Sequence, residues 1–592
     1  MKRPLVFYSI SLALGSLSAL VFLDNVFIAA AIAASFFIIM FYTLKIKFCI
    51  LSAIFFIFGV VSFNMYFNIR PQDPSQIRVV EKKSYYFIGD YRGRKIILKN
   101  KLDKLKEGEN IKVYGDFKRE LNAQKGIIGT YYIKKYETGK KDFIYSIYEF
   151  KRNIYEKFKE VIGEERSALV MALCYGETSY ISQDEMQKFQ KLGVIHAVSV
   201  SGFHMAIIYQ VLESIVGLKI AVIVSALYVF FTGMAAATMR SFIMIFLFKL
   251  SKIFFKEYDS ISSLSLSALI LITVKPYYIV DLGFDLSFLA TLGILLYNGK
   301  IYRKLFMLPQ KLASSMSLTF SSQIFTLPYI AFTIQNFSWG FMLGNLFLLP
   351  LFSIIVVLGN AALCVCFVEP LFKLLCKAME VIFTAIDGAN MVVLKLCPEV
   401  IYLKYIDGLA FIAVFVSFLM YKKGYRKLKY VPIVCFILVF LGVYTPFMNI
   451  TFINNDNGKA AIIKQGISKV MICSYDDFHS SWITNIKDDQ YIGKVITNPV
   501  KNFTYIINSN SYLKIDNDMN SKLHVKNKEF QILFDDGNKN DTEVFNRNNC
   551  IFISRIKSKN KNATKKYENP LEGSTSYVII FNMIFKIPTI CD

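Results

Sequence analysis

The chain has 592 residues, of which 54% are hydrophobic and only 19% are charged, and it carries a formal net charge of +24. A soluble protein of this length would form several domains with a larger charged fraction. Stretches of about eighteen or more residues with almost no charge recur along the chain, which predicts a membrane protein with many spans.

The first three apolar stretches, residues 5–23, 26–44 and 48–67, are each long enough to cross a membrane. The first is a span rather than a cleaved signal peptide, because a second span follows at once. Basic residues concentrate in short loops, and such loops favour the cytoplasmic side. This rule places the N-terminus in the cytoplasm of a multi-pass cytoplasmic membrane protein. It places residues 70–141 and the tail 450–592 on the extracytoplasmic side.

Residues 70–141 differ in character from the spans around them. Short runs rich in aromatic and β-branched residues are separated by turn signals, which predicts a small antiparallel β-barrel or meander. This segment holds 19 Lys and Arg against 9 Asp and Glu, with aromatic residues interleaved among the bases.

Basic grooves with stacking rings hold single-stranded nucleic acid in small barrels. The alternative is a basic β domain beside anionic lipid, with its rings in the core. The candidate DNA-binding residues are Lys82, Lys83, Tyr85, Tyr86, Arg92, Arg94, Lys95, Lys112, Lys118 and Arg119.

After the barrel, the amphipathic pattern of residues 143–163 predicts a helix that lies along the membrane interface. Ser182 and Glu185 form the capping box of a short helix that leads to residue 193. Further apolar helical segments are expected at 205–233, 239–255, 261–274, 282–299, 312–334, 339–368, 371–397, 407–421 and 430–447.

These elements predict a mainly α fold: a polytopic membrane helix bundle with an inserted extracytoplasmic β-barrel and an α/β or β-rich tail. The expected domains are N-terminal membrane helices, the β domain, interfacial helices, a membrane channel domain and the tail, over residues 1–69, 70–141, 142–195, 196–449 and 450–592.

The stretch HAVSVSGFH, residues 196–204, places polar groups in an otherwise apolar run. A serine protease would need a glycine two residues before Ser201 and a histidine base on another helix, yet after His204 the next histidine is His479. A metal site would need three or four ligands, and this stretch offers two histidines. The third interpretation, the lining of a polar path through the membrane, fits best.

Glycine after serine in the middle of a span permits a helix break, whose freed backbone groups must line a cavity or be buried in protein. Other polar groups follow within apolar segments. Asp281 is alternatively a helix N-cap, and Arg240 alternatively caps a loop. The candidate path residues are His196, Ser199, Ser201, Gly202, His204, Arg240, Asp281, Asp285 and Gln323.

The motifs GVIHAVSVSGFHMAII, GETSYIS, FTGMAAATMRSFIM, DLGFDLSFLATLGILL and SLTFSSQIFTLPYIAF lie between about residues 165 and 420. Together they resemble the ComEC family of competence proteins, the membrane channels of bacterial DNA uptake. The resemblance implies transport of single-stranded DNA, with membrane lipid, an outside DNA receptor and a cytoplasmic ATPase or helicase as partners. It also implies that residues 70–141 form an OB-like barrel. The runner-up is a transporter or flippase for another polyanionic or lipid-linked substrate.

Two departures from the family pattern stand out. The family's barrel often holds a disulfide, yet residues 70–141 contain no cysteine. Many members end in a metallo-β-lactamase-like domain with a His-x-His-x-Asp-His cluster, and INNDNGKAAIIKQGISKVMICSYDD resembles its opening. His479 and His524 are, however, the only histidines after residue 450. We therefore expect residues 450–592 to be a truncated, non-catalytic remnant, and the chain to be a channel without a metal, a cofactor or an enzymatic activity.

Overall fold

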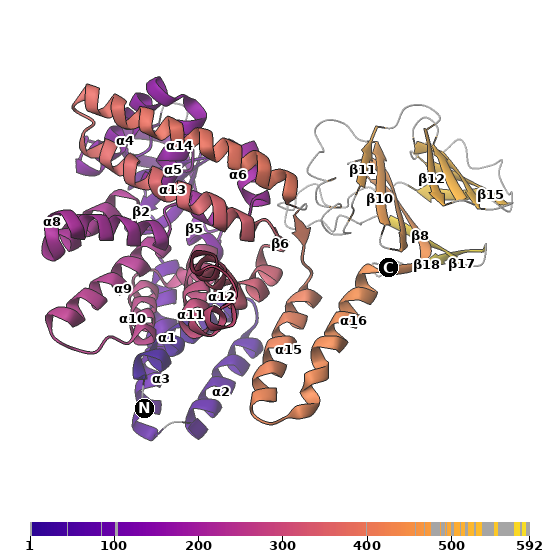
Figure 1. Ribbon diagram of the computed structural model, residues 1–592, viewed down its shortest axis with the longest axis horizontal. Coiled ribbons are helices and arrows are strands. Elements are labelled where there is room, and N and C mark those ends of the chain that lie inside the picture. Colours follow the sequence, from indigo (N-terminus) through magenta and orange to yellow (C-terminus); the bar gives the residue numbers. More distant parts are fainter. Residues whose placement is uncertain are drawn as a thin grey trace. The chain divides into compact units, whose positions relative to one another are not determined.

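A computed structural model describes most of the chain (Figure 1). The described residues are 3–43, 45–83, 86–100, 105–397, 400–455, 458–466, 468–474, 483, 486, 492, 494–498, 503–508, 511–515, 519–525, 528–535, 550–554, 574–580 and 583–587. Two candidate residues, Tyr85 and His479, lie outside them. The chain forms two compact units, the first from Met1–Tyr329 and Ser338–Val400, the second from Ile330–Phe337 and Ile401–Asp592.

The first unit begins with three membrane-length helices, α1 (Pro4–Phe22), α2 (Val26–Thr43) and α3 (Ile46–Phe67). Their bounds confirm the three predicted N-terminal spans to within two residues. Helices α1 and α3 pack closely because glycines face the partner helix: a Cβ on Gly15 would lie 2.1 Å from the Phe56 carbonyl oxygen. Small residues at such contacts let two helix backbones approach within a membrane.

A closed barrel follows, with strand order β1-β2-β3-β5-β4. It comprises β1 (Ser75–Lys82), β2 (Phe87–Tyr91), β3 (Arg94–Lys99), β4 (Asn110–Lys118), the 3₁₀ helix η1 (Ala123–Lys125) and β5 (Ile127–Thr138). The predicted OB-like barrel is thus present. It is not purely antiparallel as expected, because β3 pairs with β5 in parallel. Phe87 and Tyr91, two of the interleaved rings, are buried in its core.

Four helices connect the barrel to the bundle: α4 (Phe143–Ile162), α5 (Glu164–Tyr175), α6 (Gln183–Lys191) and α7 (Ile195–Val198). The predicted capping box is present, since Ser182 Oγ accepts from the Glu185 backbone N–H at 3.2 Å. Helix α4 is amphipathic as expected. Its apolar face is buried against protein, because Ile154, Phe158 and Ile162 belong to the core that α4 shares with its neighbours. The placement of α4 at the membrane interface stays a prediction.

The remaining helices of the first unit are α8 (Gly202–Phe231), α9 (Ala236–Ile253), α10 (Ser260–Val274), η2 (Pro276–Val280), α11 (Leu282–Lys304), α12 (Gln310–Thr333), α13 (Phe341–Cys364) and α14 (Glu369–Leu396). They lie where the apolar segments predicted them. The last residues of α12 belong to the second unit. Helix α8 is broken at Gly217, whose φ of 74° and ψ of 170° are non-helical.

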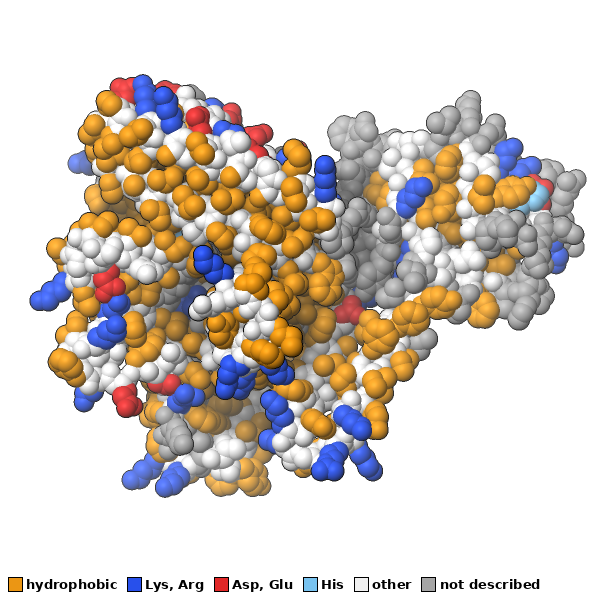
Figure 2. Space-filling model, in the orientation of Figure 1, with side chains coloured by type: hydrophobic (Ala, Val, Ile, Leu, Met, Phe, Trp, Pro, Cys, Tyr) orange, Lys and Arg blue, Asp and Glu red, His pale blue; other side chains and the backbone are white. Residues whose placement is uncertain are grey.

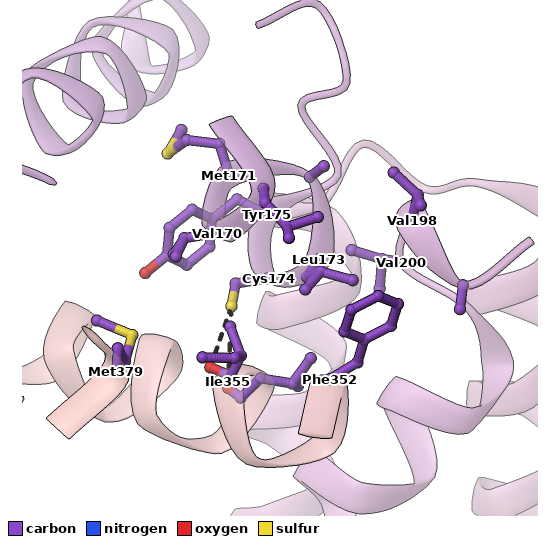
Figure 3. Packing of buried hydrophobic residues seen from close by; sticks show 14 of the residues in the cluster. Val170, Met171, Leu173, Cys174, Tyr175, Val198, Val200, Phe352, Ile355 and Met379 are labelled. Carbon is purple, nitrogen blue, oxygen red and sulfur yellow. Dashed lines mark hydrogen bonds between the residues drawn. The ribbon is translucent and has the colours of Figure 1, made fainter. Parts of the chain in front are cut away.

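Helix α5 lies in a buried core that it shares with α13 and α8 (Figure 3). Every residue from Ser167 to Tyr175 is buried. The Tyr175 hydroxyl donates to the Gly359 carbonyl at 2.8 Å, and the Tyr228 hydroxyl donates to the Cys174 carbonyl at 2.5 Å. These bonds satisfy polar groups inside the core and hold α5 against α13 and α8.

The surface of the first unit is strongly apolar. Figure 2 shows hydrophobic side chains over most of the face in view, with charged side chains gathered toward its edges. Phe27 is 86% exposed and Ile215 is 73% exposed. Apolar exposure on this scale is rare in soluble proteins and suits a lipid environment. Seven of the described helices are long and apolar enough to cross a membrane, namely α1, α2, α3, α8, α11, α13 and α15 (Tyr405–Lys422), so the chain is a multi-pass membrane protein.

After the last residues of α12, the second unit contains a short antiparallel pair, β6 (Asn336–Phe337) and β7 (Ile401–Tyr402). These strands are followed by α15, η3 (Arg426–Tyr430) and α16 (Val431–Val443). The sequence predicted a last span over residues 430–447. Helix α16 is shorter, with 13 residues, because strand β8 begins at Thr445. At 1.5 Å per residue it is about 20 Å long.

Two sheets complete the second unit. One has the order β11-β10-β9-β8-β17-β18, the other β12-β13-β14-β15-β16. Their strands are β8 (Thr445–Asn455), β9 (Gly458–Gly466), β10 (Ser468–Ser474), β11 (Lys494–Thr497), β12 (Phe503–Asn508), β13 (Ser511–Ile515), β14 (Ser521–Val525), β15 (Lys528–Asp535), β16 (Cys550–Ser554), β17 (Ser574–Ile580) and β18 (Met583–Ile587). The sheets share one apolar core, which confirms the predicted β-rich tail. The predicted strand-turn-strand opening is the antiparallel run β8-β9-β10.

Candidate functional site

Residues 199–201 interrupt the helix between α7 and α8. Ser199 and Ser201 both have extended backbones, and α8 begins at Gly202. The Ser201 backbone N–H donates to His204 Nδ1 at 3.3 Å, so the His204 side chain caps the first turn of its own helix. The structure thus contains the helix break that the Ser-Gly pair predicted.

The two histidines of this stretch differ in exposure. His204 is fully buried, and within the described part of the chain its Nε2 has no hydrogen-bond partner. Because Nδ1 accepts a hydrogen bond, a neutral His204 carries its proton on Nε2. His196 and Ser199 are exposed. The accessible polar groups of the stretch are therefore His196 and Ser199, whereas His204 supports the break from inside.

Gly202 lies in close contact with α9. A Cβ at this position would lie 2.3 Å from Ser241 Oγ and 2.6 Å from Arg240 Nη2. Real Cβ atoms do not approach other atoms this closely, so any other residue would push α8 or the arginine aside. Glycine is thus needed here because it allows the start of α8 to lie directly on the Arg240 guanidinium.

Arg240 connects three helices in the bundle. Its Nε donates to Ser287 Oγ on α11 at 3.0 Å, Nη1 lies 3.6 Å from the Met244 sulfur, and the guanidinium lies over the Phe288 ring at 5.9 Å. Arg240 is only 9% exposed, and within the described residues it forms no ion pair with a carboxylate. Its position within α9 differs from the alternative in which it caps a loop.

The surroundings of Arg240 are electropositive. The N-terminal end of a helix carries about half a positive charge and unpaired backbone N–H groups. Here the start of α8 and the Arg240 guanidinium meet at Gly202, although two positive groups repel each other. Backbone N–H groups at a helix start, together with a planar guanidinium, are well suited to bind an anion such as a phosphate.

The other three path candidates lie on α11 and α12. Asp281 is the N-cap of α11, since its Oδ1 accepts from the Phe284 N–H at 2.8 Å, which confirms the alternative stated for it. Asp285 accepts from the Tyr329 hydroxyl at 2.5 Å, and Gln323 accepts from the Thr326 hydroxyl at 3.1 Å. The hydrogen bonds described for these three side chains stay within α11 and α12.

Two ion pairs that the sequence did not single out hold this region together. Lys249 on α9 contacts both carboxylate oxygens of Glu213 on α8, at 2.6 and 2.5 Å. Lys151 on α4, which is buried, pairs with Glu177 in the GETSYIS motif at 2.5 Å. The signal was present, because Glu213 and Lys249 each lie in an apolar run, where a charge requires a partner.

Three of the candidate cations of the barrel contact the helical part of the first unit. Arg94 Nε donates to the Tyr66 carbonyl at 2.8 Å, and Arg119 Nη2 donates to Asn68 Oδ1 at 2.9 Å. Lys95 Nζ lies 5.4 Å from the centre of the Tyr277 ring. These contacts fix the barrel against α3 and η2, so the charges concerned already have protein partners.

A second set of contacts fixes the barrel to α4. Arg78 Nη1 donates to Asp142 Oδ1 at 2.9 Å, and Arg152 Nη1 donates to the Glu107 carbonyl at 2.8 Å. The hydrogen bond from Arg78 lowers the pKa of the Asp142 carboxyl to about 2, so this ion pair persists at neutral pH. The barrel is therefore held from two sides.

The other candidate cations of the barrel fall into two groups. Lys118 pairs with Glu120 at 2.7 Å, and Lys83 pairs with Glu81. We call Lys82, Arg92 and Lys112 the barrel cation set. These three are exposed, lie 5.8, 5.4 and 5.5 Å from the centres of the rings of Phe87, Tyr91 and Tyr114, and form no ion pair among the described residues. Tyr86, in the turn between β1 and β2, is half-buried.

Within the described residues, no group of three or more His, Cys, Asp and Glu side chains is placed to hold a metal ion. His524 lies on β14, and its Nε2 is 3.4 Å from Glu529 Oε2. Because His479 lies outside the described residues, the absence of a metal from the second unit stays a prediction from the sequence.

Residues 173–427, which include every path candidate, match the model of a family described as Competence protein. The chain is 23% identical to ComE operon protein 3 of Bacillus subtilis (strain 168) over 230 residues, which are 37% of this chain and 29% of that protein. It is 30% identical to an uncharacterized protein of Aquifex aeolicus over 151 residues, 24% of this chain and 36% of the relative.

A third relative, uncharacterized protein MG316 of Mycoplasma genitalium, is 29% identical over 118 residues, 19% of this chain and 31% of the relative. The matched segments thus span about a third of the length of each of these curated relatives. No solved structure matches the chain.

Proposed function

We propose that this chain, whose residues 173–427 match the Competence protein family model, conducts single-stranded DNA across the cytoplasmic membrane. The observation that supports this most strongly is the contact between Arg240 and the start of α8 at Gly202. A buried arginine without a carboxylate partner among the described residues is costly unless an anion visits it. A strand of DNA supplies such an anion with every nucleotide.

The path that we propose passes the helix break. His196 and Ser199 are exposed there and present neutral hydrogen-bonding groups to bases and sugars. Arg240 and backbone N–H groups at the start of α8 then contact the phosphates, and the guanidinium offers them two parallel hydrogen bonds. Asp285 and Gln323 are further candidates for the same path, on α11 and α12.

The barrel is proposed to receive the strand on the extracytoplasmic side. Lys82, Arg92 and Lys112 have no acidic partner among the described residues, whereas Arg94, Lys95 and Arg119 contact the helices. A DNA receptor outside and an ATPase or helicase inside are proposed partners, because the sequence contains no GxxxxGK[ST] motif with which to use ATP.

Replacing the barrel cation set with alanine (Lys82→Ala, Arg92→Ala and Lys112→Ala together) is expected to weaken binding of oligo(dT) to the full chain by about tenfold or more at low salt. Each lost phosphate contact should also reduce the slope of log affinity against log salt by about 0.7. Fluorescence anisotropy of the chain in nanodiscs measures both quantities.

The control is the matched triple variant Lys134→Ala, Lys135→Ala and Lys118→Ala, which removes three exposed barrel lysines that are each paired with a carboxylate. It should alter affinity less, because a lysine that is already paired with a carboxylate is less available to contact a phosphate. Equal losses for the two triple variants would show that only the net charge of the barrel matters.

DNA uptake with and without this chain tests the proposed function itself. Cells that express the chain should accumulate full-length, fluorescently labelled single strands in a nuclease-protected form, and cells without it should not. Full length is expected because the tail holds only two histidines, His479 and His524, too few for a binuclear metal site. Shortened strands that become full-length in His479→Ala or His524→Ala would instead identify the tail as a nuclease.

A further inference from the structure

The outer face of the five-stranded sheet in the second unit carries a pattern of residues that neither the membrane path nor the barrel uses. Strand β13 alternates buried and exposed residues, and β14 does so in step with it. Leu513 and Leu523 point into the core between the sheets. The opposite side presents what we call the β13–β14 face, which consists of Ile506, Tyr512, Lys514, Lys522 and His524.

We infer that the β13–β14 face binds single-stranded nucleic acid, as a second binding surface that is independent of the barrel. Two aromatic rings form its centre. Tyr512 and His524 are directly paired across the strands, and their rings stack with centroids 4.6 Å apart and an interplanar angle of 13°. Tyr512 remains 37% exposed. Because the two rings already stack on each other, a base would bind by extending this stack at an outer ring face.

Two lysines lie beside this platform. Lys514 and Lys522 are also a direct cross-strand pair, and both are exposed. Like charges directly opposite each other destabilise a sheet. Glu529 relieves only one of them, because it lies 3.5 Å from Lys522 and Lys514 forms no ion pair among the described residues. A bound phosphate would relieve both lysines at once.

The spacing fits one nucleotide. Lys514 follows Tyr512 by two residues on the same face, which is about 7 Å along a strand. A base stacked on the rings would therefore place its phosphate near the lysine pair. Ile506, 72% exposed and paired with Tyr512 on β12, extends the apolar part of the platform. Stacked rings with adjacent cations favour a nucleic acid over a lipid surface. A surface that binds lipid would instead insert several aliphatic or aromatic side chains into the membrane.

Lysine footprinting of the full chain tests this inference. The chain is placed in phosphatidylcholine nanodiscs, acetylated with and without oligo(dT), and analysed by mass spectrometry. The chain used here carries alanine at the barrel cation set. The protection of Lys514 and Lys522 therefore does not depend on whether the barrel binds DNA. We expect oligo(dT) to slow acetylation of Lys514 and Lys522 at least about fivefold, and to leave Lys494, an exposed lysine on β11, unchanged.

The variant Tyr512→Ala should remove most of this protection and lower the melting temperature only slightly, because the loss is limited to its stacking with His524 on the outside of the sheet. Lys494→Ala is the control and should retain the protection. Unprotected Lys514 and Lys522 at saturating oligo(dT) would overturn the inference. Protection by phosphatidylglycerol vesicles but not by oligo(dT) would also overturn it, and would identify the face as a membrane contact. So would protection that requires the intact barrel cation set.

Discussion

Gly202→Leu is expected to lower DNA uptake by about two orders of magnitude while leaving the protein inserted in the membrane and able to bind DNA outside. An added side chain would overlap Ser241 Oγ and the Arg240 guanidinium, since even a Cβ would lie 2.3 and 2.6 Å from them. Displacing a positioned group by about 1 Å is enough to cost about a hundredfold in rate. Nuclease-protected fluorescent DNA is the measurement.

Gly299→Leu is the matched control, because Gly299 lies on α11 and a Cβ there meets nothing within 4 Å. Gly202→Ala should give an intermediate loss, since it adds only the first atom of the clash. A Gly202→Leu protein that is inserted, binds DNA and takes it up at the normal rate would show that this contact is ordinary packing.

Arg240→Gln is expected to reduce uptake at least about tenfold and yet leave thermal stability unchanged or slightly increased. Uptake falls because the cation that contacts each phosphate is lost. Stability does not fall, because a buried charge with no carboxylate partner among the described residues, beside the positive end of α8, costs free energy in the folded protein. The glutamine amide retains a hydrogen-bonding group near Ser287.

A loss of uptake without a loss of thermal stability would separate a role in transport from a structural role. Arg240→Lys should fall between the wild type and Arg240→Gln, because an ammonium lacks the planar fork of the guanidinium. Arg303→Gln is the control, as Arg303 lies at the exposed end of α11. A drop in melting temperature parallel to the loss of uptake would assign Arg240 to packing instead.

The positions of the helices followed from the sequence because a membrane requires about twenty consecutive apolar residues per span. The helix break at Ser201-Gly202 and the capping box at Ser182 were equally local signals, and the structure contains both. The end of the last span was predicted too late. The predicted span included residues 445–447, which belong to strand β8, and β8 is held by pairing with β9 and β17.

The sequence does not show which side chains of the barrel strands point outward. Phe87 and Tyr91 share one face of β2, and Ile88 on the opposite face is apolar as well, so the pattern permits either face to be the core. The structure buries both rings. Likewise, no local pattern distinguishes Arg94, which contacts a carbonyl of α3, from Arg92, which is exposed. Such differences arise only when the barrel packs against distant segments.

Two contacts join α8 to α9 across a turn. Gly202 lies against Arg240, and Glu213 pairs with Lys249. The sequence marked Arg240 and Gly202 separately as unusual for an apolar segment, but their meeting depends on how two helices cross. The sequence thus identified the unusual residues, whereas the structure shows which of them lie in contact.

The most direct test of the proposed path is the reactivity of a single cysteine at the helix break. Ser199→Cys is introduced into a cysteine-free chain that retains DNA uptake, and it is exposed to a membrane-impermeant thiol reagent with and without single-stranded DNA. We predict that this cysteine reacts and that DNA slows the reaction at least about fivefold. Ile220→Cys, on the exposed apolar surface of α8, should stay unreactive. A Ser199→Cys thiol that never reacts, or that reacts equally fast with DNA present, would contradict a DNA path at this site.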